Sequence, residues 1–181
     1  NYGIDGYKQD NDLQCIALAM PEAVPRAAAL GYPVEYVQGI PVIVGPDNLR
    51  YKIVDAVAGR QERVFAVTLR SSSLAATKEY WCGVLGMREF ATPAGLEVGY
   101  PASLCVGWGE EQTKLHFVEV TGGAKVDHAL AGGRIANACR SVRPFYEAAL
   151  ASGQGGVLTP PLTLPTPGKA DVKVTILSDP G

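Results

Sequence analysis

Residues 64–87 read VFAVTLRSSSLAATKEYWCGVLGM, and this stretch contains the local pattern that decides the fold. The segment 64–70 is apolar over most of its length, as expected for a buried strand. The three serines at 71–73 can cap the start of a helix. From about 74 to 84, the side chains that would face a sheet recur at helical spacing. The stretch therefore predicts a strand followed by a helix that packs on a sheet.

A similar order of elements occurs three times along the chain, which indicates a repeat. We expect each unit to be a βαβββ module with a curved sheet and a helix on its convex face. Such a module leaves its concave face open, so two modules should pack edge to edge and enclose a pocket. The sequence thus predicts an α+β fold of repeated modules. The predicted strands are 13–20, 33–37, 40–44, 51–55, 64–70, 88–91, 96–100, 103–107, 114–120, 134–139, 157–164 and 171–177, and the predicted helices are 21–30, 74–84 and 144–151.

Composition excludes several classes of partner. The 181 residues carry a net charge of −2, and no basic cluster suggests nucleic-acid binding. The longest apolar runs have the length of strands, so we expect no membrane span. The four cysteines are scattered and only two histidines occur, which argues against a zinc knuckle. Isolated thiols are typical of a reducing intracellular compartment, and we expect the cytosol or the mitochondrion.

Several ordered motifs resemble the vicinal oxygen chelate superfamily, also called glyoxalase/bleomycin-resistance proteins. The similarity is most specific to the glyoxalase domain-containing protein 4 family, and it extends over nearly the whole chain. An aromatic pair followed by Leu-Gly-Met, at residues 80–87, looks like the helix exit of these domains. The other matching stretches are Asn1–Lys8, Val126–Ala129, Gly133–Ala136, Leu158–Pro160, Thr166–Ala170 and Ile176–Pro180.

The resemblance implies a domain organisation. Members of this family carry four modules in two tandem domains, and the chain matches the family from the second module onward. We therefore expect residues 1–60 to be the second module of a first domain. Residues 61–181 would form a second domain, with modules at 61–122 and 126–181 and its last strand missing.

The resemblance also implies where a metal would bind. Active relatives take a divalent ion, Zn, Ni, Fe or Mg, on one residue from the opening strand and one from the closing strand of each paired module. In the second unit these positions fall on Ala66, which cannot coordinate, and on His116, the remaining candidate metal ligand. Alternation along the strand places His116 toward the pocket and its two neighbours toward the helix. In the third unit the opening position falls on Arg134, whose guanidinium cannot serve as a ligand.

In the first unit the matching positions fall on Cys15 and Lys52. The candidates for a ligand pocket are six side chains: Cys15, Lys52, Ala66, Thr68, His116 and Arg134. Of these, we expect Cys15 to be a core residue and Lys52 a surface one. Arg134 and His116 could together form a cationic pocket for a carboxylate or phosphate, or Arg134 could simply pair with a nearby acid. His128 could act as a general base, or it could pack at a module junction. No residue is assigned as catalytic.

Three functions remain open. The leading interpretation is a glyoxalase-like protein with a degenerate metal site that binds a small anionic metabolite or serves in protein interaction. In that case glyoxalase I (lactoylglutathione lyase) activity is not expected. The second is a metal-dependent lyase, isomerase or dioxygenase of the same superfamily, with ligands supplied by segments outside the chain. The third is an accessory subunit in a homodimer or a larger assembly.

Overall fold

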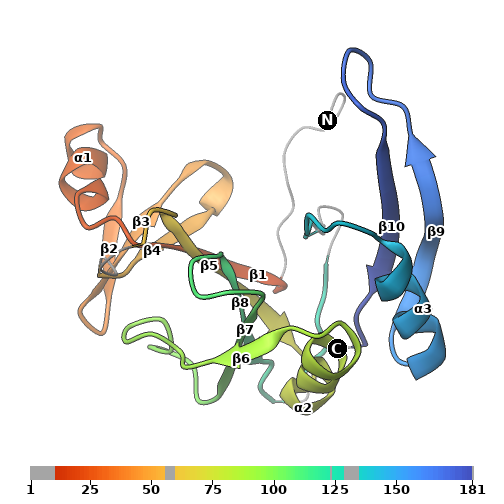
Figure 1. Cartoon of the computed structure of the whole chain (residues 1–181). Helices are drawn as coiled ribbons and strands as arrows, with labels where there is room; N and C mark the ends of the chain where they lie inside the picture. The colour runs from red at the N-terminus through yellow and green to blue at the C-terminus, as the bar shows by residue number, and fades with distance from the viewer. Residues whose placement is uncertain (1–10, 56–59, 123, 129–134, 181) are drawn as a thin grey trace.

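The computed structural model describes residues 11–55, 60–122, 124–128 and 135–180. Within these ranges the strands form one eight-stranded sheet and one separate two-stranded sheet. Figure 1 shows the large sheet with helices α1 and α2 at its periphery, and the two-stranded sheet standing beside it with α3. The first unit of the sequence and the second both lie in the large sheet, and the third provides the small one.

The first module begins with β1, Leu13–Leu18, and continues through α1, Ala23–Ala29. Three strands follow: β2, Val34–Val37; β3, Ile40–Val44; and β4, Arg50–Ile53, with a short 3-10 turn, η1, at Pro46–Asn48 between the last two. The predicted elements of this unit are confirmed with small differences at their ends. The module thus has the expected βαβββ order.

The second module begins with β5, Val64–Ser71, and the helix that the opening stretch predicted. The side chain of Ser73 accepts a hydrogen bond from the amide of Ala76, so the serine cap is confirmed. The helix consists of an α-helical part, α2, Leu74–Lys78, and a wider π-helical turn, η2, Glu79–Val84. Three strands complete the module: β6, Arg88–Phe90; β7, Ser103–Gly107; and β8, Lys114–Glu119.

The two modules join through their first strands. The order of strands in the sheet is β2-β3-β4-β1-β5-β8-β7-β6, with β1 and β5 antiparallel at its centre. The partner of the second module is therefore the first module, whereas we expected the third. The predicted boundary at residue 60 falls between two strand systems that share one sheet. Edge pairing depends on which strand edges meet in space, and sequence order does not determine it.

The helices cover one face of the large sheet. Under α1, two alanines of the helix pack on Ile43 and Ile53. Under α2 and η2, Leu115 and Phe117 pack with Leu74 and Trp81, as the alternation along β8 predicted. The opposite, concave face is covered by the connection between β6 and β7, residues 91–102, which reaches across to the first module.

This connection corrects the prediction of a strand at 96–100. Residues 96–100 form turns, with the amide of Leu96 bonded to the carbonyl of Pro93 and that of Tyr100 to that of Glu97. Gly95 and Gly99 have φ angles of +88° and +90°, a left-handed conformation that interrupts a strand. The apolar residues of this segment therefore bury themselves by folding over the sheet. Leu96 is fully buried among Ala17, Ala66 and neighbouring core residues.

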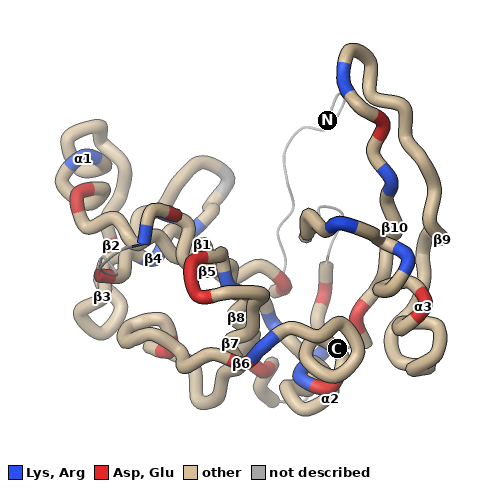
Figure 2. The backbone as a smooth tube through the Cα atoms, in the orientation of Figure 1, with Lys and Arg blue, Asp and Glu red and all other residues tan. Residues whose placement is uncertain are grey.

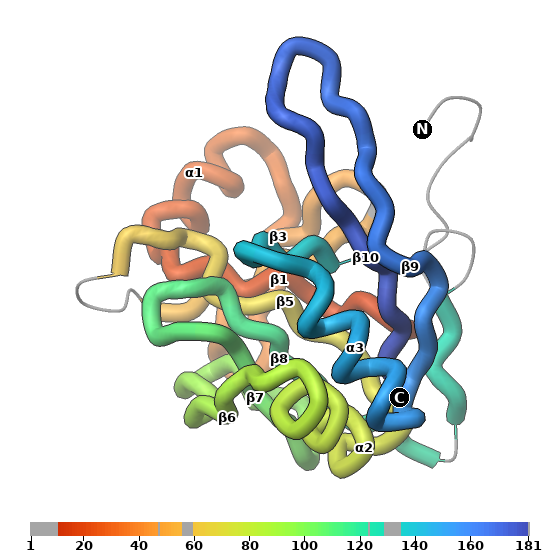
Figure 3. Tube along the Cα trace, turned by 45° about the vertical axis from the view of Figure 1, so that its right-hand side comes forward, coloured from red at the N-terminus to blue at the C-terminus, as the bar shows by residue number. Residues whose placement is uncertain are grey.

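The third unit consists of α3, Arg143–Ser152, and a hairpin of β9, Gly156–Leu164, and β10, Val172–Ser178. Figure 3 shows the hairpin extending beyond the helices as a separate arm. Residues 135–139 are described but form no strand, contrary to the prediction for 134–139. The unit is attached to the second module by Trp81, whose indole N–H donates to Asp179 Oδ2 at 2.8 Å, and by Trp108, whose ring lies 5.6 Å from that of Phe145.

Charges of both signs are interspersed along the backbone, as Figure 2 shows. No helix in the described segments has the length and apolarity needed to cross a membrane.

Candidate functional site

The candidate site lies at the centre of the concave face, where the two modules meet. Around the pair Ile16–Val67, an approximate two-fold relationship brings the modules into correspondence. Ala17 of β1 is beside Lys52 of β4, and Thr68 of β5 is beside His116 of β8. Lys52 and His116 therefore hold equivalent positions, one from each module.

By the same relationship Cys15 and Ala66 are equivalent. Cys15 of β1 pairs with Thr68 of β5, and Ala66 of β5 pairs with Ala17 of β1. Four of the five positions at which the superfamily resemblance implies metal ligands in this chain thus converge in one place, and the fifth, Arg134, lies outside the described residues. They do so with two positions from the first module and two from the second. No position in the third unit is needed to complete the set.

His116 is fully buried, with 0% of its surface exposed. Its Nδ1 lies 3.1 Å from Thr68 Oγ1, and its Nε2 has no hydrogen-bond partner. The ring of Tyr100 packs edge-on against the imidazole at a centroid distance of 6.1 Å. Burial lowers the pKa of His116 to about 4, the charge of Lys52 adds to this effect, and Glu97 opposes it. The imidazole is therefore neutral at physiological pH, with one ring nitrogen unused.

Lys52 is 4% exposed, which corrects the expectation that it is a surface residue. Its Nζ donates to the carbonyl of Leu96 at 3.0 Å and to that of Val98 at 2.9 Å. It also lies 5.1 Å from the centroid of the Tyr100 ring. Because the 91–102 connection supplies these acceptors, the ammonium can be buried without a direct carboxylate partner. Burial lowers its pKa, and Cys15 and Glu97 act in the opposite direction.

Cys15 is buried, as predicted. Burial raises the pKa of its thiol, against the opposing effects of hydrogen bonds to Thr68 and Tyr100 and of the charges on Lys52 and Arg50. The thiol is therefore protonated at neutral pH. Thr68 and Tyr100 both act on the pKa of this thiol, and Thr68 Oγ1 lies 3.1 Å from His116 Nδ1. Ala66 contributes no polar atom and is fully buried in the apolar cluster beneath Leu96.

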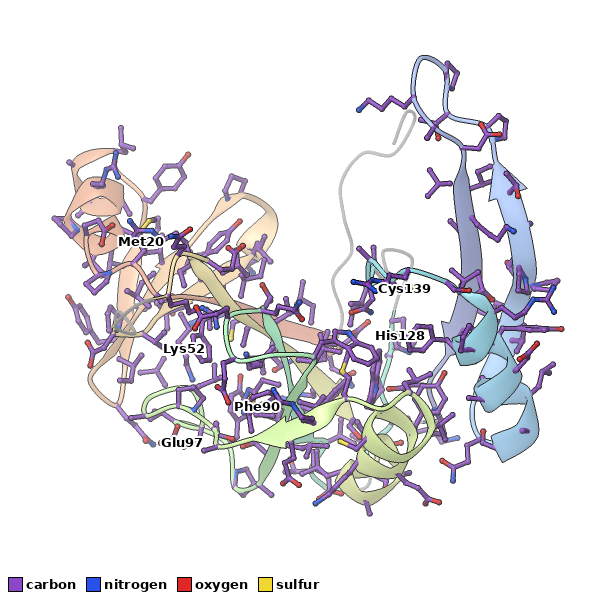
Figure 4. All side chains as sticks on the ribbon, viewed as in Figure 1. Met20, Lys52, Phe90, Glu97, His128 and Cys139 are labelled. Carbon is purple, nitrogen blue, oxygen red and sulfur yellow. The ribbon has the colours of Figure 1, made fainter. Side chains whose placement is uncertain are left out.

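A cavity of about 160 Å³ opens beside these residues. Its lining includes two cations, Arg50 and Lys52, and no carboxylate. Arg50 forms an ion pair with Glu35 at 2.5 Å on the exposed side. Figure 4 shows Lys52 within the large-sheet half of the molecule, and Glu97 on the same side of the structure. The remaining lining residues are Gln14, Cys15, Val37, Val42, Val98, Gly99 and Tyr100.

Five of the six pocket candidates from the sequence therefore occupy one neighbourhood: Cys15, Lys52, Ala66, Thr68 and His116. The sixth, Arg134, lies outside the described residues, so the expected pairing of Arg134 with His116 is not addressed. Among the described residues, the positive charge of Lys52 lowers the pKa of His116.

His128 is elsewhere, on the side of the third unit in Figure 4. Its Nδ1 lies 2.6 Å from Asp12 Oδ2, and its side chain is largely exposed. In the same region the side chain of Asn11 bonds to the carbonyl of Lys125 and the amide of Asp127. The histidine thus contributes to fastening the segment 124–128 to the start of β1.

Two important residues of the site were missed from the sequence. Arg50 lies two residues before Lys52 on the same strand, so alternation could have placed it on the same face. Tyr100 gave no such signal, because it reaches the site from a connection that was predicted as a strand.

Across the described ranges, no three side chains of His, Cys, Asp or Glu come together in a group that could hold a metal ion.

Comparison with known proteins identifies the family. The family described as glyoxalase domain-containing protein 4-like, C-terminal domain, matches residues 73–181. Glyoxalase domain-containing protein 4 of Mus musculus is 35% identical over 182 residues, covering 99% of this chain and 59% of that protein. Glyoxalase 1 of Caenorhabditis briggsae is 30% identical, over 99% of this chain and 60% of that protein. The chain thus spans about three-fifths of the length of these curated relatives.

Solved structures show the same fold. Glyoxalase I from Zea mays superposes with a TM-score of 0.76, and its V278E variant with a TM-score of 0.80. Each is 22% identical to this chain and aligns with 99% of it, and each alignment covers 68% of the maize chain. The predicted α+β fold of glyoxalase-like modules is therefore confirmed.

Proposed function

The chain belongs to the glyoxalase domain-containing protein 4-like family, and we propose that its concave pocket is a degenerate metal site that now binds a small anion without a metal. The observation that carries the proposal is the buried ammonium of Lys52, which occupies a position equivalent to that of His116. An ammonium at this position attracts anions and repels divalent cations.

The donor set does not fit a divalent ion. An ammonium has three donors and no lone pair, and an alanine has no polar atom, so Lys52 and Ala66 cannot coordinate. The thiol of Cys15 would have to lose a proton that burial holds in place. His116 Nε2 is then the one ready ligand among the four positions. Catalytic zinc sites ordinarily use three protein ligands.

The same residues suit an anion. Lys52 uses two N–H groups on loop carbonyls, and one remains. Because those carbonyls are neutral, they satisfy hydrogen bonds but leave the positive charge without a counterion in contact. Glu97 is exposed and has the weakest of the three effects on the pKa of Lys52. Arg50 adds a second cation at the cavity wall. A carboxylate or a phosphate group in the cavity would therefore balance a charge that is already buried.

Two measurements on the purified protein test this proposal. Elemental analysis should find no stoichiometric divalent metal, and calorimetry with acetate and inorganic phosphate should detect binding of at least one of them. Lys52→Met should abolish this binding, whereas the matched control Lys169→Met, at an exposed position in the β9–β10 turn, should retain it. One tightly held divalent ion per chain, or anion binding that survives Lys52→Met, would refute the proposal. The first outcome would favour a metal-dependent lyase, isomerase or dioxygenase.

A further inference from the structure

The lining of the cavity combines charged side chains with three valines, Val37, Val42 and Val98. Two of these valines lie directly beside the buried ammonium. Val42 of β3 pairs with Lys52 of β4, and the carbonyl of Val98 accepts a hydrogen bond from Lys52 Nζ at 2.9 Å. The cavity therefore offers a positive charge and an apolar surface next to each other.

The valines are placed there by the alternation of the strands. Val34 of β2 packs with the cluster under α1, so Val37, three residues later, faces the opposite, concave side. Val37 and Val98 are both partly exposed, whereas Val42 is 3% exposed. A hydrocarbon group in the cavity would thus remove the exposed surface of Val37 and Val98 from water, which favours its binding.

Among the described residues of the lining, one positive charge lacks a counterion in contact. The lining has two cations, Arg50 and Lys52, and none of its described members is a carboxylate. The guanidinium of Arg50 already pairs with Glu35 at 2.5 Å, whereas Lys52 donates to two neutral carbonyls. Beyond the lining, the nearby charges of Glu97 and Arg70 have opposite signs. One negative charge on a ligand therefore balances the pocket, and a second would have to displace Glu35 from Arg50.

The volume of the cavity sets the length of the ligand. An apolar cavity of about 150 Å³ holds benzene, which has about six non-hydrogen atoms. The cavity here has a volume of about 160 Å³. A carboxylate with about four carbons has the same number of non-hydrogen atoms as benzene and would therefore fill it.

We infer, on the basis of the anion site proposed above, that the ligand is a short aliphatic monocarboxylate. Its carboxylate binds the ammonium of Lys52, and its hydrocarbon chain lies against Val37 and Val98. Phosphate suits this pocket less, because the valine side chains offer no hydrogen bond to the oxygens that face them. A dicarboxylate suits it less, because its second charge competes with Glu35 for Arg50.

Calorimetry on the wild-type protein with acetate, propionate, butyrate, malonate and inorganic phosphate, at pH 7.5 and constant ionic strength, tests the inference. Affinity should rise about fourfold for each methylene group, or about sixteenfold from acetate to butyrate. Malonate and phosphate should bind more weakly than butyrate. Equal affinity for acetate and butyrate, or tighter binding of phosphate than of butyrate, would overturn the inference; if that binding still depends on Lys52, the anion site stands. Absence of binding by every carboxylate and by phosphate would overturn both.

A pair of variants in β2 tests where the hydrocarbon chain lies. Val37→Thr places a hydroxyl on the cavity side, so the sixteenfold ratio of butyrate to acetate affinity should fall to about eightfold or less. Val34→Thr makes the same change on the opposite face of the strand and should leave the ratio unchanged. An unchanged ratio in Val37→Thr, or an equal fall in both variants, would contradict the assigned contact.

A second pair of variants tests the charge of the ligand. Glu35→Gln removes the counterion of Arg50, so the affinity for malonate should rise by about two- to fivefold relative to that for butyrate, the effect of a half-exposed ion pair. Glu22→Gln breaks the exposed pair of Glu22 with Arg63, away from the cavity, and should leave the relative affinities unchanged. Relative affinities that are the same in Glu35→Gln as in the wild type would overturn the assignment of a monoanion.

Discussion

His116 should make the stability of the protein depend on pH. Its pKa is about 4 in the folded protein and 6.5 in the unfolded chain, and burial is the main cause of the difference. The unfolded chain therefore takes up a proton at a higher pH than the folded one. The stabilising contribution of the neutral imidazole is complete above pH 6.5 and is lost as the pH falls toward 4. At 1.36 kcal/mol per pH unit, the whole range corresponds to about 3 kcal/mol.

Urea unfolding of the wild type and of His116→Gln, at several pH values between 7.5 and 4.5, measures this contribution. Carboxylates also lose their native interactions on acidification, but they do so in both proteins, so the difference between the two proteins isolates His116. The free energy of unfolding should fall more steeply for the wild type, by about 2–3 kcal/mol over the range. His128→Gln leaves His116 in place and serves as the control, in which the part of the dependence that is due to His116 should persist. A parallel fall in the wild type and His116→Gln would refute the reasoning.

Three further predictions concern the elements around the site. Leu96→Ala should lower the free energy of unfolding by about 2–5 kcal/mol in urea titrations, because Leu96 is fully buried between the 91–102 connection and the sheet. A loss below about 1 kcal/mol would show that this connection does not pack on the sheet as described. Gly95→Ala should lower the free energy of unfolding by about 1–3 kcal/mol, since the φ of Gly95 is +88° and the added carbon would lie 3.0 Å from Ile40. Gly168→Ala should lower it less in the same titration, because Gly168 also has a positive φ but has open space around it. Among the cysteines, Cys139 is exposed, whereas Cys15 and Cys105 are buried and have raised pKa values. Mass spectrometry after brief alkylation of the folded protein should therefore find the label on Cys139. Early labelling of Cys15 would contradict the structure.

The sequence allowed most strands and helices to be predicted, because their signals are local. The serine cap at 73 and the alternation around His116 are examples, and each depends on residues only a few positions apart. The segment 96–100 failed because its apolar residues suit a strand, while the backbone conformation at Gly95 and Gly99 requires turns. Composition alone does not reveal a φ angle.

Several members of the candidate site could be predicted, but Arg50, Tyr100 and the organisation of the site could not. The resemblance identified Cys15, Lys52, Ala66 and His116 one at a time, within their own modules. Which modules share a sheet depends on the pairing of β1 with β5, and that pairing has no local signature. The burial of Lys52 depends on carbonyls more than 40 residues away, and backbone acceptors are present at every position of any sequence.

The equivalence of Lys52 and His116 has a consequence for how such a pocket can change. In a symmetric pair of identical subunits, a substitution at one position appears on both sides of the axis at once. Two lysines would then bring two ammonium groups together, and two histidines would restore a pair of metal ligands. Covalent linkage of the two halves in one chain removes this constraint, so each half can diverge alone. A cation on one side and a neutral imidazole on the other make the site polar along one direction, and the site can therefore distinguish the two ends of an asymmetric molecule.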